Sequence, residues 1–176
     1  MMFKPLTLAT VTALAWAGSL QAASVNLCWR GAGGYTMTGR MTLPDSAMFK
    51  TIVTEDDVTA FKISGYHRGK LIGNWDAATR NTDTTWHLRF DPAGMVFLTG
   101  GRFAGFSSQG WNANGEVSNC GTVGFGFNTG NYGQDICVNG VYIAESSIAP
   151  DAPLLVTLDP VSPDCRNAAV VSKAIR

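Results

Sequence analysis

The chain has 176 residues with 13 basic and 13 acidic side chains, so its formal net charge is zero. Only 15% of the residues are charged and 45% are hydrophobic, which excludes intrinsic disorder and indicates a single globular domain. The lack of net positive charge and of any basic run argues against a nucleic-acid partner.

The first residues follow the layout of a secretory signal peptide. Lys4 precedes an apolar stretch from Pro5 to about Gly18, and small residues follow at the expected cleavage site. We expect residues 1–22 to be removed on export, with cleavage after Ala23 as the alternative. A transmembrane anchor is disfavoured because the stretch is shorter than the ~20 apolar residues of a bilayer span. The mature chain is expected to have no membrane span and to be secreted or periplasmic.

Alternating apolar and polar residues predict strands over 25–29 and 35–43. Thr54 has the chemistry of a helix cap, but β-branched and aromatic residues over 58–66 predict a strand. At most one helical turn should precede that strand. A tight turn then leads to a returning strand over 71–75.

A hairpin is predicted over 86–98. Apolar residues alternate with polar ones over 86–90, residues 91–94 read Asp-Pro-Ala-Gly, and the apolar run 95–98 returns. Proline and glycine stand where a type I turn and its left-handed exit accept them.

The remaining segments are rich in glycine. Residues 100–115 form a long Gly/Ser/Asn-rich stretch, which predicts an irregular loop. The segment 117–127 is glycine-dense as well. Further strand candidates lie over 135–144, with an interruption at Asn139-Gly140, and over 154–158.

Short strands separated by frequent turns predict an all-β fold. We expect an antiparallel, jelly-roll-like β-sandwich over 23–160, after the signal peptide at 1–22. A C-terminal tail over 161–176 should be held to this domain by a disulfide.

Four cysteines lie in the expected mature chain: Cys28, Cys120, Cys137 and Cys165. An even number in an exported chain predicts two disulfides. A metal site is disfavoured because no Cys-x-x-Cys pair exists and neither histidine is at ligand spacing from a cysteine. We expect Cys120 to pair with Cys137 across the glycine-rich turn. Cys28 would then pair with Cys165 and tie the N-terminal strand to the tail.

Aromatic residues on loops are the candidate binding residues. Trp111, Phe103 and Phe106 lie within 100–115, and Tyr132 lies in the next loop. Exposed loop aromatics stack on sugars or anchor a partner protein. The alternative is that the long loop folds back and buries them over the core. The first interpretation makes 100–115 a recognition loop with Trp111 as its anchor.

Recognisable catalytic patterns are lacking. The segment 105–110 differs from a nucleophile elbow because its second glycine comes one residue late and no helix follows. Asp56 and Asp57 are adjacent, so on a strand they would point to opposite faces. His67 and His87 are expected at the surface, where nothing in the sequence supplies a third zinc ligand.

Residues 112–116, Asn-Ala-Asn-Gly-Glu, place oxygen-bearing side chains around a glycine. An EF-hand loop needs an acidic first residue and a glutamate six residues after the glycine, so the segment does not match. A structural Ca²⁺ in a looser oxygen cage, completed by Asp135 or Asp83, is the alternative. We favour a simple Asn-Gly turn and expect no cofactor.

Residues 53–61, Val-Thr-Glu-Asp-Asp-Val-Thr-Ala-Phe, carry two acids, a hydrophobic residue, a threonine and an aromatic residue. The segment resembles one found in uncharacterised exported β-sandwich proteins of Gram-negative bacteria. The resemblance covers about the middle third of the chain. It implies the fold and export, and it carries no catalytic residue.

Three functions fit these observations. The first is a non-enzymatic exported β-sandwich that binds a glycan or an envelope protein. The second is a small hydrolase that acts on an extracellular polysaccharide and needs converging polar side chains. The third is a self-assembling component that pairs through sheet edges.

Overall fold

The computed structural model describes residues 22–100, 108–116 and 120–166. The signal peptide expected over 1–22 lies, apart from Ala22, outside the described residues. Phe103 and Phe106, two of the candidate binding residues, lie outside them as well.

Two antiparallel sheets form the described part of the chain. The larger sheet has the strand order β3-β7-β8-β13-β1-β2-β4-β5, and the smaller has the order β12-β11-β10-β9-β6. The strands of the larger sheet are β1 (Ala22–Arg30), β2 (Tyr35–Pro44), β3 (Val53–Thr54), β4 (Ala60–His67), β5 (Lys70–Asp76), β7 (Arg89–Asp91), β8 (Val96–Phe97) and β13 (Leu154–Thr157). The strands of the smaller sheet are β6 (Trp86–His87), β9 (Gln109–Trp111), β10 (Phe125–Thr129), β11 (Gln134–Val138) and β12 (Val141–Ile148).

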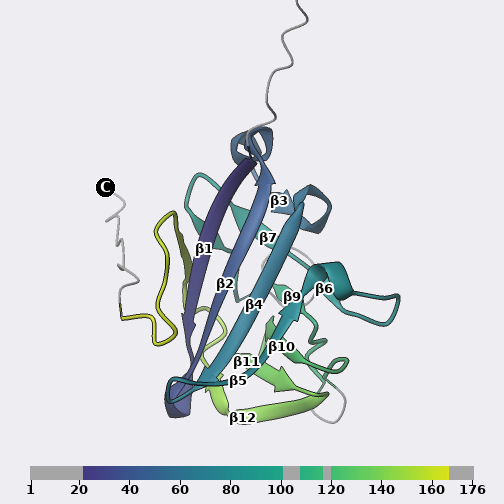
Figure 1. The fold of residues 1–176 in the computed structure, drawn as a ribbon, viewed down its shortest axis with the longest axis vertical. Helices are drawn as coiled ribbons and strands as arrows, with labels where there is room; N and C mark the ends of the chain where they lie inside the picture. Colours follow the sequence, from purple (N-terminus) through teal and green to yellow (C-terminus); the bar gives the residue numbers. More distant parts are fainter. Residues whose placement is uncertain (1–21, 101–107, 117–119, 167–176) are drawn as a thin grey trace, which may run out of the picture.

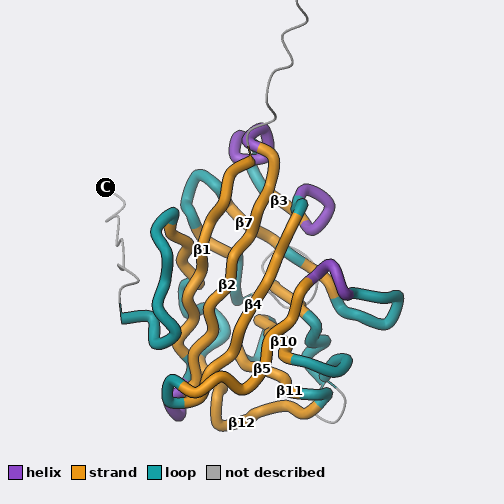
Figure 2. The backbone as a smooth tube through the Cα atoms, in the orientation of Figure 1, coloured by secondary structure: helices purple, strands orange, loops and turns teal. Residues whose placement is uncertain are grey.

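Helical structure among the described residues is confined to short 3-10 segments between strands (Figure 2). These segments are η1 (Ala32–Gly34), η2 (Asp45–Phe49), η3 (Glu55–Asp57) and η4 (Ala77–Thr79). Thr54 caps η3 as expected, in a capping box closed by Asp57. The prediction of an all-β, disulfide-stapled antiparallel sandwich is therefore confirmed.

The long strands β1, β2 and β4 lie side by side and form the centre of the larger sheet (Figure 1). Their register places Met41 opposite Val25 on one side and opposite Phe61 on the other. All three side chains are almost completely buried. The sequence alternation over these strands therefore turns one face of the sheet toward the core.

An aromatic cluster joins the two sheets. The Trp111 ring of β9 packs against Phe61 of β4, Phe97 of β8 and Phe127 of β10, with ring centroids 4.7, 5.0 and 5.1 Å apart respectively. Trp111 has no exposed surface. Rings in edge-on and tilted arrangements at these distances add favourable contacts to the burial of apolar area.

Two buried amide side chains also link the sheets. Gln109 of β9 donates from Nε2 to the carbonyls of Arg89 and Leu98, each at 2.8 Å, and its Oε1 accepts the Arg89 N–H. The indole N–H of Trp29 donates to Gln134 of β11 at 3.0 Å. These polar groups are buried with partners, so their burial carries no large desolvation penalty.

Two sequence expectations need correction here. The segment 100–115 contains β9, which lies between β10 and β6 in the smaller sheet, and Trp111 is a core residue of that strand rather than the exposed anchor of a loop. The strand expected over 86–90 is divided at the buried Leu88, because β6 joins the smaller sheet and β7 the larger one. The expected turn forms, since Asp91 Oδ1 accepts the N–H groups of Ala93 and Gly94, but its left-handed residue is Met95, with a φ of +51°, and not Gly94.

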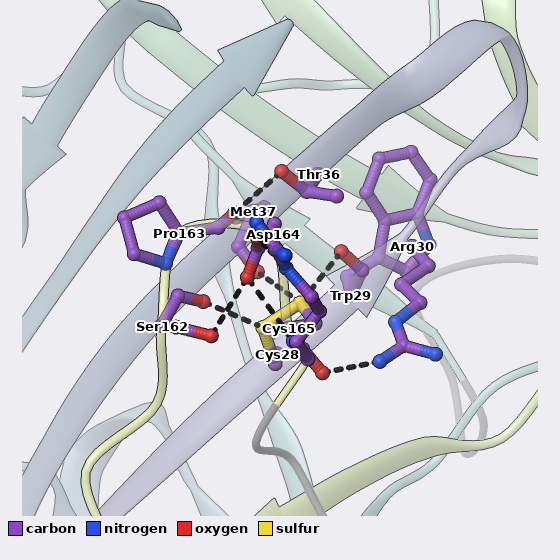
Figure 3. The surroundings of a disulfide bond; sticks show 10 residues. Cys28, Trp29, Arg30, Thr36, Met37, Ser162, Pro163, Asp164 and Cys165 are labelled. Carbon is purple, nitrogen blue, oxygen red and sulfur yellow. Dashed lines mark hydrogen bonds and ion pairs between the residues drawn. A yellow bond between two sulfur atoms is a disulfide. The ribbon is translucent and has the colours of Figure 1, made fainter. Parts of the chain in front are cut away.

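Two disulfides join Cys28 to Cys165 and Cys120 to Cys137, the pairing chosen from the sequence. Figure 3 shows the first of them, between β1 and the segment that follows β13. Arg30 donates to the carbonyl of Cys165, and the Thr36 hydroxyl donates to the carbonyl of Pro163 at 2.6 Å. The start of the tail is therefore held to β1 and β2 by hydrogen bonds as well as by sulfur.

The two sheets lie in close contact at Gly65 of β4. A Cβ atom at Gly65 would stand 1.9 Å from the ring of Phe125. We predict that Gly65→Ala lowers the free energy of unfolding by about 2 kcal/mol or more, because the core has no room for it. Gly130→Ala is the matched control, since a Cβ there meets nothing within 4 Å. Equal urea denaturation midpoints for the two variants would contradict this packing.

Trp111→Ala tests the central position of β9. We predict a loss of about 3–5 kcal/mol, because the change removes a large ring from a packed core. Tyr132→Ala, at a side chain that is 93% exposed, should change stability by less than about 0.5 kcal/mol. A Trp111→Ala protein that melts at the wild-type temperature would show that the ring is not buried.

Candidate functional site

A row of residues crosses the outer face of the smaller sheet. His87 of β6 is opposite Gly110 of β9, Gly110 is opposite Asn128 of β10, and Asn128 is opposite Asp135 of β11. We call these four residues the outer row. Their neighbours Trp86, Trp111, Phe127 and Ile136 form the parallel row that packs toward the core. Because side chains alternate along a strand, the outer row points away from the core.

The outer row lies along a pocket with a volume of about 410 Å³. Gly110 has no side chain, and its neighbours lie close over it: a Cβ there would stand 2.9 Å from the Thr85 methyl and 3.2 Å from the Ala113 carbonyl oxygen. The other lining residues are Thr85, Ser108, Gln109, Ala113, Asn114, Gly115, Thr129, Gly130, Asn131, Tyr132 and Gly133.

One wall of the pocket is the segment 112–116, which lies over the sheet because glycine lets the backbones approach. A Cβ at Gly126 of β10 would stand 2.2 Å from the carbonyl oxygen of Asn112. The Asn112 amide donates to the carbonyls of Val123 and Phe125. The Cys120–Cys137 disulfide links Cys120, a few residues beyond this segment, to β11. The wall is therefore fixed by backbone contact, hydrogen bonds and a covalent bond.

The contacts of residues 112–116 are those of a hydrogen-bonded turn. The carbonyl oxygen of the Asn112 side chain accepts a hydrogen bond from Thr122, and that of Asn114 accepts the Glu116 N–H at 2.9 Å. Gly115 has a φ of +80°, which suits glycine. The segment is thus a turn whose side-chain oxygens bond to the protein itself. Among the described residues, no group of three or more His, Cys, Asp or Glu could hold a metal ion.

Asp135 is the only acidic residue in the pocket lining. Its exposed fraction is 8%, and Asn128 Nδ2 donates to its Oδ1 at 2.6 Å. Burial raises the pKa of Asp135 to about 6, against the opposing effect of this hydrogen bond. At neutral pH the carboxylate is therefore mostly ionised in a poorly hydrated position.

His87 stands at the other end of the outer row, beside a glutamate. Its Nδ1 lies 3.6 Å from Glu55 Oε1, and Glu55 Oε2 accepts a 2.6 Å bond from Arg89. Burial and the nearby Arg89 guanidinium lower the pKa of His87. The His87 side chain is only 12% exposed, so the expected surface position was wrong. Its buried Nε2 has no hydrogen-bond partner in the described part of the chain.

The structure places the sequence-predicted aromatic residues in different environments. Tyr132 lies on the turn between β10 and β11, lines the pocket and is 93% exposed. Trp111 lies on the opposite, core-facing side of the sheet. Phe103 and Phe106 fall outside the described residues. Of the two candidates within the described ranges, Tyr132 is the one placed where an aromatic ring could contact a ligand.

Sequence reasoning did not bring the polar members of the outer row together: it weighed His87 as a zinc ligand and Asp135 as a Ca²⁺ ligand, and it did not single out Asn128. The position of Asp135 could have marked it as a candidate site residue, because an acidic side chain is unusual in a strand as buried as β11. Its proximity to Asn128 depends on the register of β10 and β11, which the amino-acid pattern does not specify.

The carboxylates limit the chemistry that this pocket can perform. All 13 acidic residues of the sequence lie in the described ranges, and Asp135 alone among them lines the pocket. Glycoside hydrolysis in its usual form needs two carboxyl groups on either side of the scissile bond. The pocket therefore lacks the pair of carboxyl groups that glycoside hydrolysis usually needs. Its polar side chains are able to recognise a ligand by hydrogen bonding.

The two disulfides indicate a non-cytoplasmic location, since such bonds persist in oxidising compartments. Within the described ranges, no helix is long and apolar enough to span a membrane.

The raised pKa of Asp135 predicts a pH-dependent stability. The ordinary pKa of 3.8 applies in the unfolded chain, so protonation favours folding. This contribution is fully present below about pH 3.8 and is lost as the pH rises through about 6. Asp135→Asn removes the buried charge and keeps the shape. We predict that this variant is more stable than the wild type by about 2–3 kcal/mol at pH 8 and nearly equal in stability at pH 4. A stability difference that is the same at both pH values would contradict the assignment.

No protein-family model, curated protein or solved structure matches this chain. The resemblance of residues 53–61 to exported β-sandwich proteins therefore stays a prediction. What the protein does has to be inferred from the pocket residues themselves.

Proposed function

We propose that this chain is an exported saccharide-binding protein, secreted or periplasmic, whose ligand occupies the pocket on the outer face of the smaller sheet. The observation that carries the proposal is the position of an exposed aromatic ring, Tyr132, beside the polar outer row. Saccharides present apolar C–H faces and polar hydroxyl edges. An aromatic ring beside hydrogen-bonding groups complements both.

The polar groups can recognise hydroxyl groups in two ways. Asp135 offers carboxylate oxygens as acceptors, and Asn128 contributes a side-chain amide. The pocket volume of about 410 Å³ lies within the range of roughly 300–1,000 Å³ typical of small-molecule sites. This volume suits a small part of a larger saccharide.

The rigidity of the surroundings supports binding. Asn128 and Asp135 lie on paired strands, and the wall over them is fastened by the Cys120–Cys137 disulfide. Groups that are already held in place lose little conformational entropy when a ligand binds. Export accounts for the signal sequence expected over 1–22 and for the disulfides.

The test is a glycan array probed with residues 23–176 of the wild type and of Tyr132→Ala. We expect the wild type to bind saccharides and the variant to bind them at least about tenfold more weakly, the scale of an aromatic hot spot. Phe49→Ala is the matched control, because Phe49 is also an exposed aromatic residue, 89% accessible, but lies in η2 and does not line the pocket. A wild type that binds no saccharide, or a Phe49→Ala loss equal to that of Tyr132→Ala, would contradict the proposal.

A further inference from the structure

Asp135 is a buried carboxylate that forms no ion pair with a cation in the described ranges. Its described partner is the neutral amide of Asn128. The lining residues within 22–100, 108–116 and 120–166 include no lysine or arginine either. Burying an ionised carboxylate without an opposite charge is costly, and proteins usually pair such groups.

His87, the basic side chain among the described lining residues, does not supply that charge. His87 lies three strand spacings from Asp135 along the outer row, about 14 Å at the backbone. Its imidazole faces Glu55, and burial together with Arg89 favours its neutral form. The charge of Asp135 is thus left to be balanced from within the pocket.

The rim carries a second group that attracts a cation. Tyr132 presents a phenol ring at the pocket, and aromatic faces bind ammonium groups through the ring quadrupole. A carboxylate in the floor and an aromatic ring at the rim together favour a ligand with a positively charged nitrogen.

We propose that the saccharide bound here is an amino sugar with a free primary ammonium group, which pairs with Asp135. This inference rests on the proposed saccharide-binding function and names its ligand class. The ammonium donates to the Asp135 carboxylate, and the neighbouring hydroxyl groups bond to Asn128. Acetylation of the amine removes both the charge and two of its N–H donors, so the acetylated sugar loses this contact.

The experiment compares two probes by titration calorimetry at about pH 6.5: a short β-linked oligomer of glucosamine and the N-acetylated oligomer of the same length. At this pH Asp135 is mostly ionised and an amine of this kind, similar to an α-amino group, is mostly protonated. We expect the wild type to bind the free-amine oligomer at least about tenfold more tightly, because a charge-assisted hydrogen bond is lost on acetylation.

Asp135→Asn should remove this preference and leave the two affinities within about twofold of each other. Asp83→Asn is the matched control, because Asp83 is an exposed acid outside the pocket lining, and it should keep the preference. Urea denaturation of Asp135→Asn checks that the variant is folded, so that a loss of binding cannot be attributed to unfolding.

Each alternative outcome has a separate meaning. Equal binding of both oligomers by the wild type would overturn the amino-sugar inference and leave saccharide binding intact. A preference that persists in Asp135→Asn would overturn the role of this carboxylate. A lysine-containing peptide that binds as tightly as the free-amine oligomer would overturn the saccharide part. Failure of the wild type to bind any glycan on the array would overturn the proposed function itself.

Discussion

The packing of Trp111 against rings from both sheets is the interaction on which this structure depends. Phe61 and Phe97 belong to the larger sheet and Phe127 to the smaller one, so a single indole connects the two layers. The strand that carries Trp111 has only three residues, and side chains alternate along it. Fixing Trp111 in the core therefore turns Gly110 outward, where it lines the pocket beneath Thr85 and Ala113.

The pocket wall is also fixed by tight packing at a glycine. Gly126 allows the backbone at Asn112 to lie directly on β10, and the Cys120–Cys137 disulfide keeps it there. A rigid wall and paired strands prevent Asp135 from turning toward bulk water. The protein thus maintains a carboxylate whose charge is poorly solvated, and a bound cation would relieve that cost. Stability and binding oppose each other at this position, which is common at functional sites.

Much of the fold could be predicted from the sequence because its signals are local. Strict alternation over 35–43 specified β2, and the Asp-Pro-Ala-Gly turn specified the hairpin of β7 and β8. The position of β9 could not be predicted, because three residues are too few to show a period and glycines surround them. The division at Leu88 was equally hidden, since an alternating run does not reveal that its two halves pair with different sheets.

The candidate site was harder to predict from the sequence than the fold. Tyr132 could be named from its loop context, whereas the outer row depends on three strand pairings that bring together residues 87, 110, 128 and 135. Residues so far apart meet only through tertiary structure. Trp111 illustrates the converse error, because a tryptophan among glycines looks like a loop anchor until the neighbouring strands that bury it are known.

The account is tested most directly by locating a bound saccharide on the protein. Backbone amide resonances of residues 23–176 would be followed by NMR while the glucosamine oligomer is added. The account predicts that the largest shift changes map to Gly110, Asn128, Tyr132 and Asp135, on the outer face of the smaller sheet. Shift changes that instead gather around the Cys28–Cys165 disulfide, or along the edge strand β5, would contradict it.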